Sequence, residues 1–247
     1  MITSSQQIVD EIFYEKYLKQ NLETVSPPRY FSMMGCIGND KDLEIVDIGT
    51  GAGDLLFLLK KNGYKNIIGV DYSKVAIKYA EKKGIKMIYA NIEEPDFLKK
   101  VGGKYDVVLL GEVLEHIFDP KRVMSILKSL LTDNGTLIIS VPNAGWFING
   151  FLLTFFPQFL RISPAFGVWT HVNQFTAYSI KNLLENNGFQ VKVIKGTGYW
   201  MMKAKKRALL RTFIVTISKL PITLTNLLAN VFPSIFSSQL IIVSTKK

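Results

Sequence analysis

The sequence is poor in cysteine and does not begin with a secretory pattern. Cys36 is the only cysteine among 247 residues, which excludes a disulfide framework and is typical of a reducing compartment. The opening residues, MITSSQQIVDEIF, carry Asp10 and Glu11 and have no basic stretch before an apolar run, so we expect no secretory signal and a cytoplasmic protein. The length allows one large α/β domain but not two comfortable ones.

Acidic residues are absent from the last quarter of the chain. All 20 Asp and Glu lie in residues 1–185 together with 20 of the 30 Lys and Arg, so residues 186–247 carry the whole net charge of +10. This segment is also apolar, which is unusual for a solvated basic tail. The combination indicates a partner that is both anionic and apolar.

Two apolar segments add to this expectation. Residues 144–160, AGWFINGFLLTFFPQFL, carry no charge, but they are too short and too interrupted by Gly and Pro to cross a membrane, which takes about 20 apolar residues. In residues 203–220 basic side chains recur every four positions opposite an apolar side, and residues 221–236 continue the apolar pattern. Such a helix either lies in an anionic membrane surface at the inner face of the membrane or packs as a lid over the active site.

The rest of the chain alternates between strand-like and helical patterns. The strand-like runs are continuously apolar, which indicates a mostly parallel sheet covered on both faces, and their alternation with helices predicts a doubly wound α/β fold. We expect a helical cap over 1–42, with an amphipathic helix in 6–23, a core over 43–195 with an apolar insertion at 144–174, an excursion over 196–238, and a last strand and tail over 239–247. The expected strands are 43–48, 66–71, 85–90, 105–111, 135–141, 188–194 and 239–245.

The glycine-rich stretch DIGTGAGD, residues 47–54, follows the first expected strand. A dinucleotide fingerprint requires a small residue three positions after its second glycine, where this sequence places Asp54 or Leu56. A phosphate-binding loop requires Gly-Lys-Ser/Thr, and the first lysine after these glycines is Lys60. Neither loop matches.

Two acids flank the glycines and indicate a different ligand. Asp47 precedes the loop, where a carboxylate suits an amino group and repels a phosphate. Asp71 ends the next strand, where a carboxylate can accept both ribose hydroxyls. An adenosyl ligand with an amino-acid tail and no phosphate satisfies both acids, and S-adenosylmethionine is such a molecule.

These motifs and three later ones resemble class I S-adenosylmethionine-dependent methyltransferases, in particular the ubiquinone O-methyltransferase-like subgroup. VDIGTGAG and IIGVDYS resemble the first two motifs, YANIEEP the segment that flanks adenine, YDVVLLGEVLEHIFDP the fourth-strand motif, and HVNQFTAYSIKNLLENNGFQV a later one. The resemblance covers about three-fifths of the chain. It implies a Rossmann-like sheet of seven strands in the order 3-2-1-4-5-7-6, with the last strand antiparallel. The cofactor-binding residues expected are Asp47, Gly49, Thr50, Gly51, Gly53, Asp71, Tyr72, Asn91, Ile92 and Glu112.

The GEVLEH stretch supplies candidates for the chemistry. On a helical turn Glu112, Glu115 and His116 share one face, so two carboxylates and an imidazole could act as a base. His171 is the second candidate for substrate contact or proton acceptance. The resemblance implies a magnesium ion in some relatives, so a divalent metal held by these residues is a less favoured alternative, and we assign no metal ligand. The alternative for Glu115 and His116 is a structural role in anchoring the next loop and capping the helix at 119–130.

The expected function is methyl transfer from S-adenosylmethionine to an oxygen, less favourably a nitrogen, of an apolar or lipid-linked small molecule. Nucleic acid is a weak alternative as the acceptor, because GEVLEH is not an Asp/Asn-Pro-Pro-aromatic motif and Cys36 follows Gly35 rather than a proline. Two other functions stay open at this point. They are an NAD(P)-dependent oxidoreductase on a related sheet and a non-catalytic, membrane-associated adaptor that has kept the fold.

Overall fold

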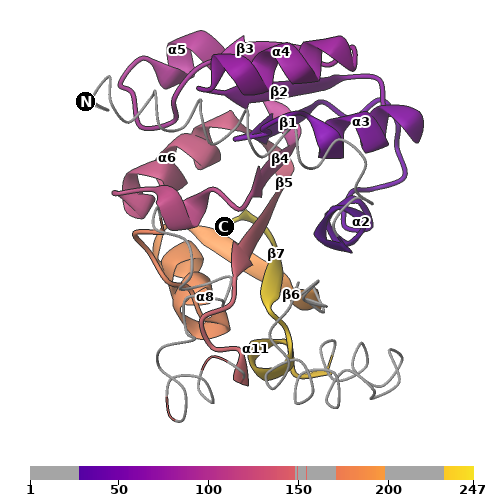
Figure 1. Ribbon diagram of the computed structural model, residues 1–247. Coiled ribbons are helices and arrows are strands. Elements are labelled where there is room, and N and C mark those ends of the chain that lie inside the picture. The colour runs from indigo at the N-terminus through magenta and orange to yellow at the C-terminus, as the bar shows by residue number, and fades with distance from the viewer. Residues whose placement is uncertain (1–27, 148, 150–153, 155–170, 198–230) are drawn as a thin grey trace.

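The computed structural model describes residues 28–147, 149, 154, 171–197 and 231–247 (Figure 1). The amphipathic helix expected in 6–23 and the basic helix expected in 203–220 lie outside the described residues. Within the described part of the chain, no helix combines the length and the apolar character that crossing a bilayer requires.

Seven strands form one sheet in the order β3-β2-β1-β4-β5-β7-β6. Strand β7 pairs antiparallel with both β5 and β6, and the pairs among β1 to β5 are parallel, which confirms the expected topology. The strands are β1 (Ile45–Ile48), β2 (Ile67–Asp71), β3 (Lys86–Tyr89), β4 (Tyr105–Gly111), β5 (Leu131–Pro142), β6 (Phe189–Thr197) and β7 (Gln239–Lys246).

Helices cover both faces of this sheet (Figure 1). Helices α2, α3 and α4 contribute to one hydrophobic cluster, which includes the fully buried Met33, Leu56 and Leu59. Helices α5, α6 and α8 contribute to the other, with Phe97 and Leu127 buried against the sheet. The helices are α2 (Pro28–Met34), α3 (Asp54–Lys61), α4 (Lys74–Lys82), α5 (Phe97–Val101), α6 (Pro120–Leu130), α8 (Ala177–Asn186) and α11 (Pro233–Phe236), with a 3₁₀ turn η1 (Leu114–His116).

The helix ends follow local sequence signals. Gly63 and Gly84 follow α3 and α4 with φ of 89° and 70°, the left-handed conformation that glycine adopts without steric cost. Asp119 caps α6 by accepting from the Arg122 N–H, so the cap of this helix is neither Glu115 nor His116. Thr176 and Ser179 form a reciprocal capping box at the start of α8.

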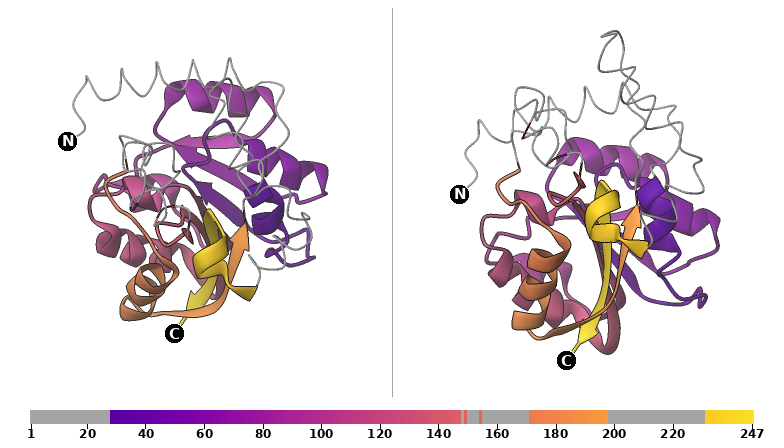
Figure 2. Two further views of the ribbon diagram at one scale, coloured as in Figure 1. Left: turned by 60° about the horizontal axis from the view of Figure 1, so that its bottom comes forward. Right: turned by 90° about the horizontal axis from the view of Figure 1, so that it is seen from below.

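A buried asparagine ties the last helix to the end of β5. The Asn143 side-chain amide donates to the carbonyl oxygens of Pro233, Ser234 and Ser237, at 3.3, 3.1 and 2.8 Å. Its backbone N–H donates to the Ser238 carbonyl at 2.9 Å. Helix α11, yellow in Figure 2, is therefore held at the start of β7, and it packs beside β6.

Candidate active site

The glycine loop between β1 and α3 uses the left-handed conformation at every second residue. Gly49, Gly51 and Gly53 have φ of 71°, 58° and 73°, a region that L side chains rarely adopt. The alternation explains the spacing of the motif. It turns the chain so that the Gly49 and Thr50 N–H groups both donate to the Val70 carbonyl, which fixes the loop to the end of β2.

Two of these glycines also have no room for a side chain. A Cβ atom on Gly49 would lie 2.3 Å from Cγ2 of Val113, and one on Gly53 would lie 2.9 Å from Cβ of Ala80. The loop is therefore packed between Val113, which follows β4, and helix α4. This close approach brings the backbone that follows β4 against the expected cofactor site.

Asp71 binds the loop itself. Its Oδ2 accepts from the Gly51 N–H and its Oδ1 from the Ser73 N–H, both at 2.8 Å. The carboxylate is 3% exposed, at the end of β2. A carboxylate oxygen can accept more than one hydrogen bond, so pinning the loop is compatible with accepting a ribose hydroxyl.

Asp47 is buried under the loop and carries an unusual pKa. Its Oδ2 accepts from the Thr50 hydroxyl at 2.7 Å. Burial raises the pKa of Asp47 from 3.8 to about 7, the charge of Asp71 adds to the rise, and the Thr50 bond and Arg29 oppose it. A cationic ligand group beside this carboxyl would favour its ionised form.

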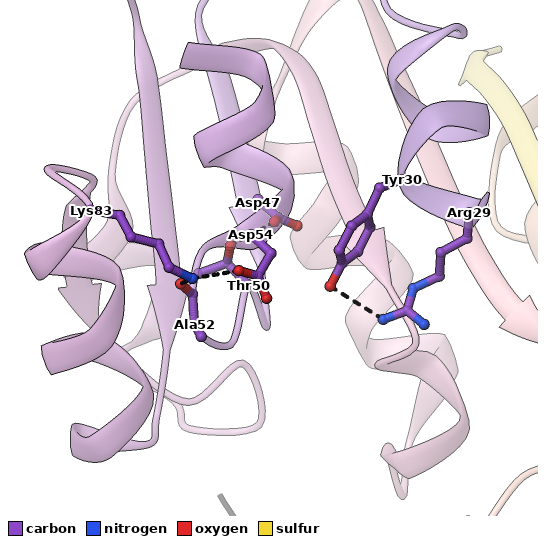
Figure 3. Close-up of polar contacts among 7 residues, drawn as sticks. All are labelled: Arg29, Tyr30, Asp47, Thr50, Ala52, Asp54 and Lys83. Carbon is purple, nitrogen blue, oxygen red and sulfur yellow. Dashed lines mark hydrogen bonds and ion pairs between the residues drawn. The ribbon is translucent and has the colours of Figure 1, made fainter. Parts of the chain in front are cut away.

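Sequence reasoning missed Arg29, which lies on α2. Figure 3 shows Arg29 and Tyr30 extending from α2 toward the level of the glycine loop, with the Arg29 guanidinium donating to the Tyr30 hydroxyl at 3.4 Å. Its charge lowers the pKa values of Asp47, Glu112 and Glu115. One cation therefore acts on three carboxyl groups that are distant in the sequence. The only signal in the sequence was a basic residue after a pair of prolines.

Lys83, just after α4, is a second residue that the sequence did not single out. Its ammonium donates to the Ala52 carbonyl at 2.8 Å and to the Asp54 carboxylate (Figure 3). The loop is thereby tied to the end of α4.

The residues expected near the adenine lie after β3. Asn91 accepts from the Glu93 N–H through its side-chain oxygen at 3.0 Å and is half-buried. Ile92 is 6% exposed and belongs to the hydrophobic cluster on the α5, α6 and α8 face. Tyr72, directly after Asp71, is half-buried at the end of β2. Their contact with a cofactor stays a prediction.

Glu112 departs from the expected helical turn. It follows β4 with φ of 57° and is the only non-glycine residue with positive φ in the described ranges. Because this left-handed residue interrupts the chain, the turn begins later, at Leu114, and the expectation that Glu112 shares a helical face with Glu115 and His116 is wrong. Its carboxylate instead accepts from the Ser140 hydroxyl at 3.2 Å and from the Gln239 amide at 3.1 Å.

The other three candidates do come together. The nearest oxygen of Glu115 lies 3.9 Å from Nε2 of both His116 and His171, and the two imidazole rings meet edge-on with centroids 4.7 Å apart. Glu115 is 1% exposed, and neither of its side-chain oxygens has a hydrogen-bond partner among the described residues. Burial raises the pKa of Glu115 well above its usual range, and the charge of Glu112 adds to the rise.

Backbone contacts bring His171 to this cluster from a distant part of the chain. The N–H groups of Val172 and Asn173 both donate to the Glu115 carbonyl at 2.9 Å, and the Asn173 side chain donates to the Ile117 carbonyl. The side chain of His171 is 7% exposed and that of His116 is 37% exposed. His116 is therefore the member of the cluster most open to a substrate.

The cluster could also hold a divalent ion. The ligand atoms of Glu115, His116 and His171 all lie within 4.8 Å of one another. Glu112 is outside that group, and its carboxylate accepts from Ser140 and Gln239. Two imidazoles and one carboxylate suit a transition ion more than magnesium, which prefers oxygen ligands. Such an ion would supply a Lewis acid that lowers the pKa of a bound hydroxyl.

Known proteins carry the same domain. A methyltransferase-domain family matches residues 12–192. The ubiquinone biosynthesis O-methyltransferase of Actinobacillus pleuropneumoniae serotype 7 (strain AP76) is 32% identical over 108 residues, which cover 40% of this chain and 46% of that protein. The mitochondrial ubiquinone biosynthesis O-methyltransferase of Homo sapiens is 26% identical over 173 residues, covering 64% of this chain and 46% of that protein. The chain thus spans about half the length of the curated relatives it matches.

Solved structures show the same fold. A SAM dependent methyltransferase from Archaeoglobus fulgidus superposes with a TM-score of 0.58 at 21% identity, over 88% of this chain and 92% of that one. The strand order, the antiparallel β7 and the left-handed glycine loop define the class I S-adenosylmethionine-dependent methyltransferase fold. The chain belongs to this methyltransferase family, and its cofactor is accordingly S-adenosylmethionine. This decides against the nicotinamide-dependent alternative.

Proposed function

We propose that the protein transfers the methyl group of S-adenosylmethionine to a hydroxyl oxygen of an apolar or lipid-linked small molecule. The observation that carries the proposal is the buried Glu115 with two imidazoles beside it, after the strand next to the glycine loop. A hydroxyl acceptor must lose a proton as it attacks, whereas the sulfonium needs no activation. A proton acceptor at this place therefore favours transfer to oxygen.

The donor would be held from two sides. Asp47 and Glu112 offer carboxylates for its ammonium, and Arg29 offers a cation for its carboxylate. Asp71 accepts ribose hydroxyls while it keeps the loop in place. Groups of both charges orient the amino-acid tail, and the orientation aligns the sulfonium with the acceptor.

In the reaction the acceptor oxygen forms a bond to the methyl carbon, and the carbon–sulfur bond breaks with its electron pair moving to sulfur. The proton of the hydroxyl passes to His116, the most exposed member of the cluster. Glu115 lies within 3.9 Å of both imidazoles and stabilises the resulting imidazolium, and His171 completes the cluster from the other side. The products are the methyl ether, S-adenosylhomocysteine and a proton held by the protein.

Labelled donor tests the proposal. The protein is incubated with S-adenosylmethionine carrying a labelled methyl group and with lipid and small-molecule extracts, and the extracts are searched by mass spectrometry for a transferred methyl. We expect label in an apolar hydroxyl compound. Donor binding without transfer to any extract would favour the adaptor alternative, and label confined to amines would overturn the assignment to oxygen.

Variants separate binding from chemistry. We expect Asp47→Ala and Asp71→Ala to abolish donor binding by calorimetry. His116→Gln is expected to keep donor affinity and to lose about 10²–10⁴-fold in turnover, the usual contribution of a general base. If turnover in the wild type falls on chelation and returns with a transition ion, the cluster binds a metal rather than acting as the base.

A further inference from the structure

The conformation of Glu112 indicates that its carboxylate has a specific task. A left-handed residue that is not glycine costs of order 1 kcal/mol or more, and a glycine at this position would serve the turn equally well. The backbone N–H of Glu112 donates to the Ser140 carbonyl at 3.0 Å, so the residue is fixed to β5 at its main chain. Because the main chain is fixed here, the left-handed conformation of the residue decides the direction of its side chain.

Neutral donors hold that side chain at both oxygens. Ser140, fully buried on β5, donates to Oε1 at 3.2 Å, and Gln239, the first residue of β7, donates to Oε2 at 3.1 Å. Hydroxyl and amide donors fix the direction of a carboxylate without cancelling its charge, and each oxygen keeps a lone pair. The charged groups that act on Glu112 are Arg29 of α2 and Glu115 of η1. The arrangement suits a carboxylate kept ready for a cationic ligand group.

The ligand side of Glu112 is the glycine loop. The next residue, Val113, is the side chain that would meet a Cβ atom on Gly49 at 2.3 Å. The charge of Arg29 lowers the pKa of both Asp47 and Glu112, so one cation acts on both carboxyl groups. On the proposed function, the ammonium of the methyl donor is a second cationic group for this pair.

We propose that Gln239, assisted by Ser140, is a positioning residue that holds the Glu112 carboxylate for the ammonium of the methyl donor. Gln239 directly follows Ser237 and Ser238, whose carbonyl oxygens accept from Asn143. The position of α11 is therefore transmitted to the donor site through one side chain. This links the donor site to the end of the basic segment 196–238. The inference rests on the proposed function, because it takes the methyl donor as the ligand.

The test is a double-mutant cycle on donor affinity. Gln239→Met removes the amide donor at similar volume, and we expect the Kd for S-adenosylmethionine, measured by calorimetry on the full chain, to rise roughly tenfold. In a Glu112→Gln background the same substitution is expected to change Kd by less than about twofold, because the group that Gln239 positions has lost its charge. Gln190→Met, an exposed position on β6, is the matched control and should leave Kd unchanged.

The pH profile separates positioning from a structural role. The Gln239 bond lowers the pKa of Glu112, which burial raises. Losing the bond should therefore raise the pKa of Glu112 in Gln239→Met, so that donor binding requires a higher pH than in the wild type. Ser140→Ala should shift the pH dependence in the same direction. A folded Gln239→Met protein with wild-type Kd would overturn this inference, and so would equal effects of the substitution in both Glu112 backgrounds. Neither result would affect the proposed function. A wild-type chain that binds no donor would instead overturn the proposed function.

Discussion

At the scale of single residues, Asp47 is a group whose ionisation changes on folding. Its pKa is about 7 in the folded protein and 3.8 at its ordinary value, because burial disfavours the charge. Between these pH values the unfolded chain binds fewer protons, so the free energy of unfolding falls as the pH rises from about 4 to about 7. The full difference is up to about 4 kcal/mol. Urea unfolding at pH 4.5, 6 and 7.5 should show a shallower fall for Asp47→Asn, and parallel curves would contradict the assignment.

The same carboxyl should respond to the donor. An ammonium beside Asp47 favours its ionised form, so binding near pH 6.5 is expected to release a proton. Calorimetry in two buffers of different ionisation enthalpy measures that release. The release should disappear well above pH 7, where Asp47 is already ionised without the donor, and a release that does not change with pH would show that the proton comes from another group.

The glycine loop allows a comparison between two alanine substitutions. Gly49→Ala combines a positive φ with a Cβ atom 2.3 Å from Val113, so we expect it to destabilise the fold by about 2–4 kcal/mol and to abolish donor binding. Gly63→Ala has a positive φ but nothing within 4 Å, so it should cost only about 1 kcal/mol and keep donor affinity. Denaturant unfolding and calorimetry check both. Equal losses in the two variants would mean that steric contact is not what requires Gly49.

Single residues also show what could and could not be predicted from the sequence. The alternating glycines and both aspartates could be recognised because their spacing is local. Arg29 could not, since its importance depends on α2 packing beside a loop that lies twenty residues later. Glu112 was assigned to a helical turn by its spacing, but a single left-handed residue, invisible in the sequence, turned its carboxylate toward Ser140 and Gln239 instead.

At the scale of elements, the joint between β5 and α11 depends on Asn143. Its amide satisfies three carbonyl oxygens and is 1% exposed. Asn143→Ala would leave those carbonyls without this donor, so we expect a loss of about 2–3 kcal/mol in the free energy of unfolding. Asn187→Ala, which removes one bond at the end of α8, should cost less than about 1 kcal/mol. Hydrogen exchange should show faster exchange over 233–239 in Asn143→Ala only; unchanged protection there would remove its role in the joint.

Element boundaries were predicted well where the signal is chemical and local. Gly63 and Gly84 follow the ends of α3 and α4, and the strands β1 to β4 begin and end within two residues of the predicted ranges. Strand β5 begins at Leu131, four residues earlier than predicted, because Leu131 already pairs with Tyr105 of β4. The turn-forming stretch TDNG that follows is an irregularity in the strand, and regular pairing with β4 resumes at Thr136.

At the scale of the whole molecule, the sequence alone predicts a parallel sheet but not its order. Continuous apolar runs such as those of β4 and β5 show only that both faces are covered. The order 3-2-1-4-5-7-6 entered with the resemblance, and the structure confirms it. His171 joins Glu115 and His116 because this order brings the chain after β5 back over the end of β4, a contact between positions more than fifty residues apart that no local pattern contains.

The charge of the whole chain leads to the last prediction. We propose that the protein contacts anionic membranes from the inner face, because the acid-free residues 186–247 carry the entire charge excess and Val231, Phe232 and Ile235 are 45–56% exposed where the described chain resumes. Each basic residue near an anionic surface contributes about 1 kcal/mol, an attraction that salt screens.

The protein should therefore sediment with anionic vesicles at low salt and be released at high salt. Replacing Lys205, Lys206 and Arg207 by Glu should release it at low salt as well, whereas the same three changes at Lys99, Lys100 and Lys104 keep the net charge equal and should not. Equal recovery in the supernatant with and without vesicles would mean that the basic segment serves the protein's own fold.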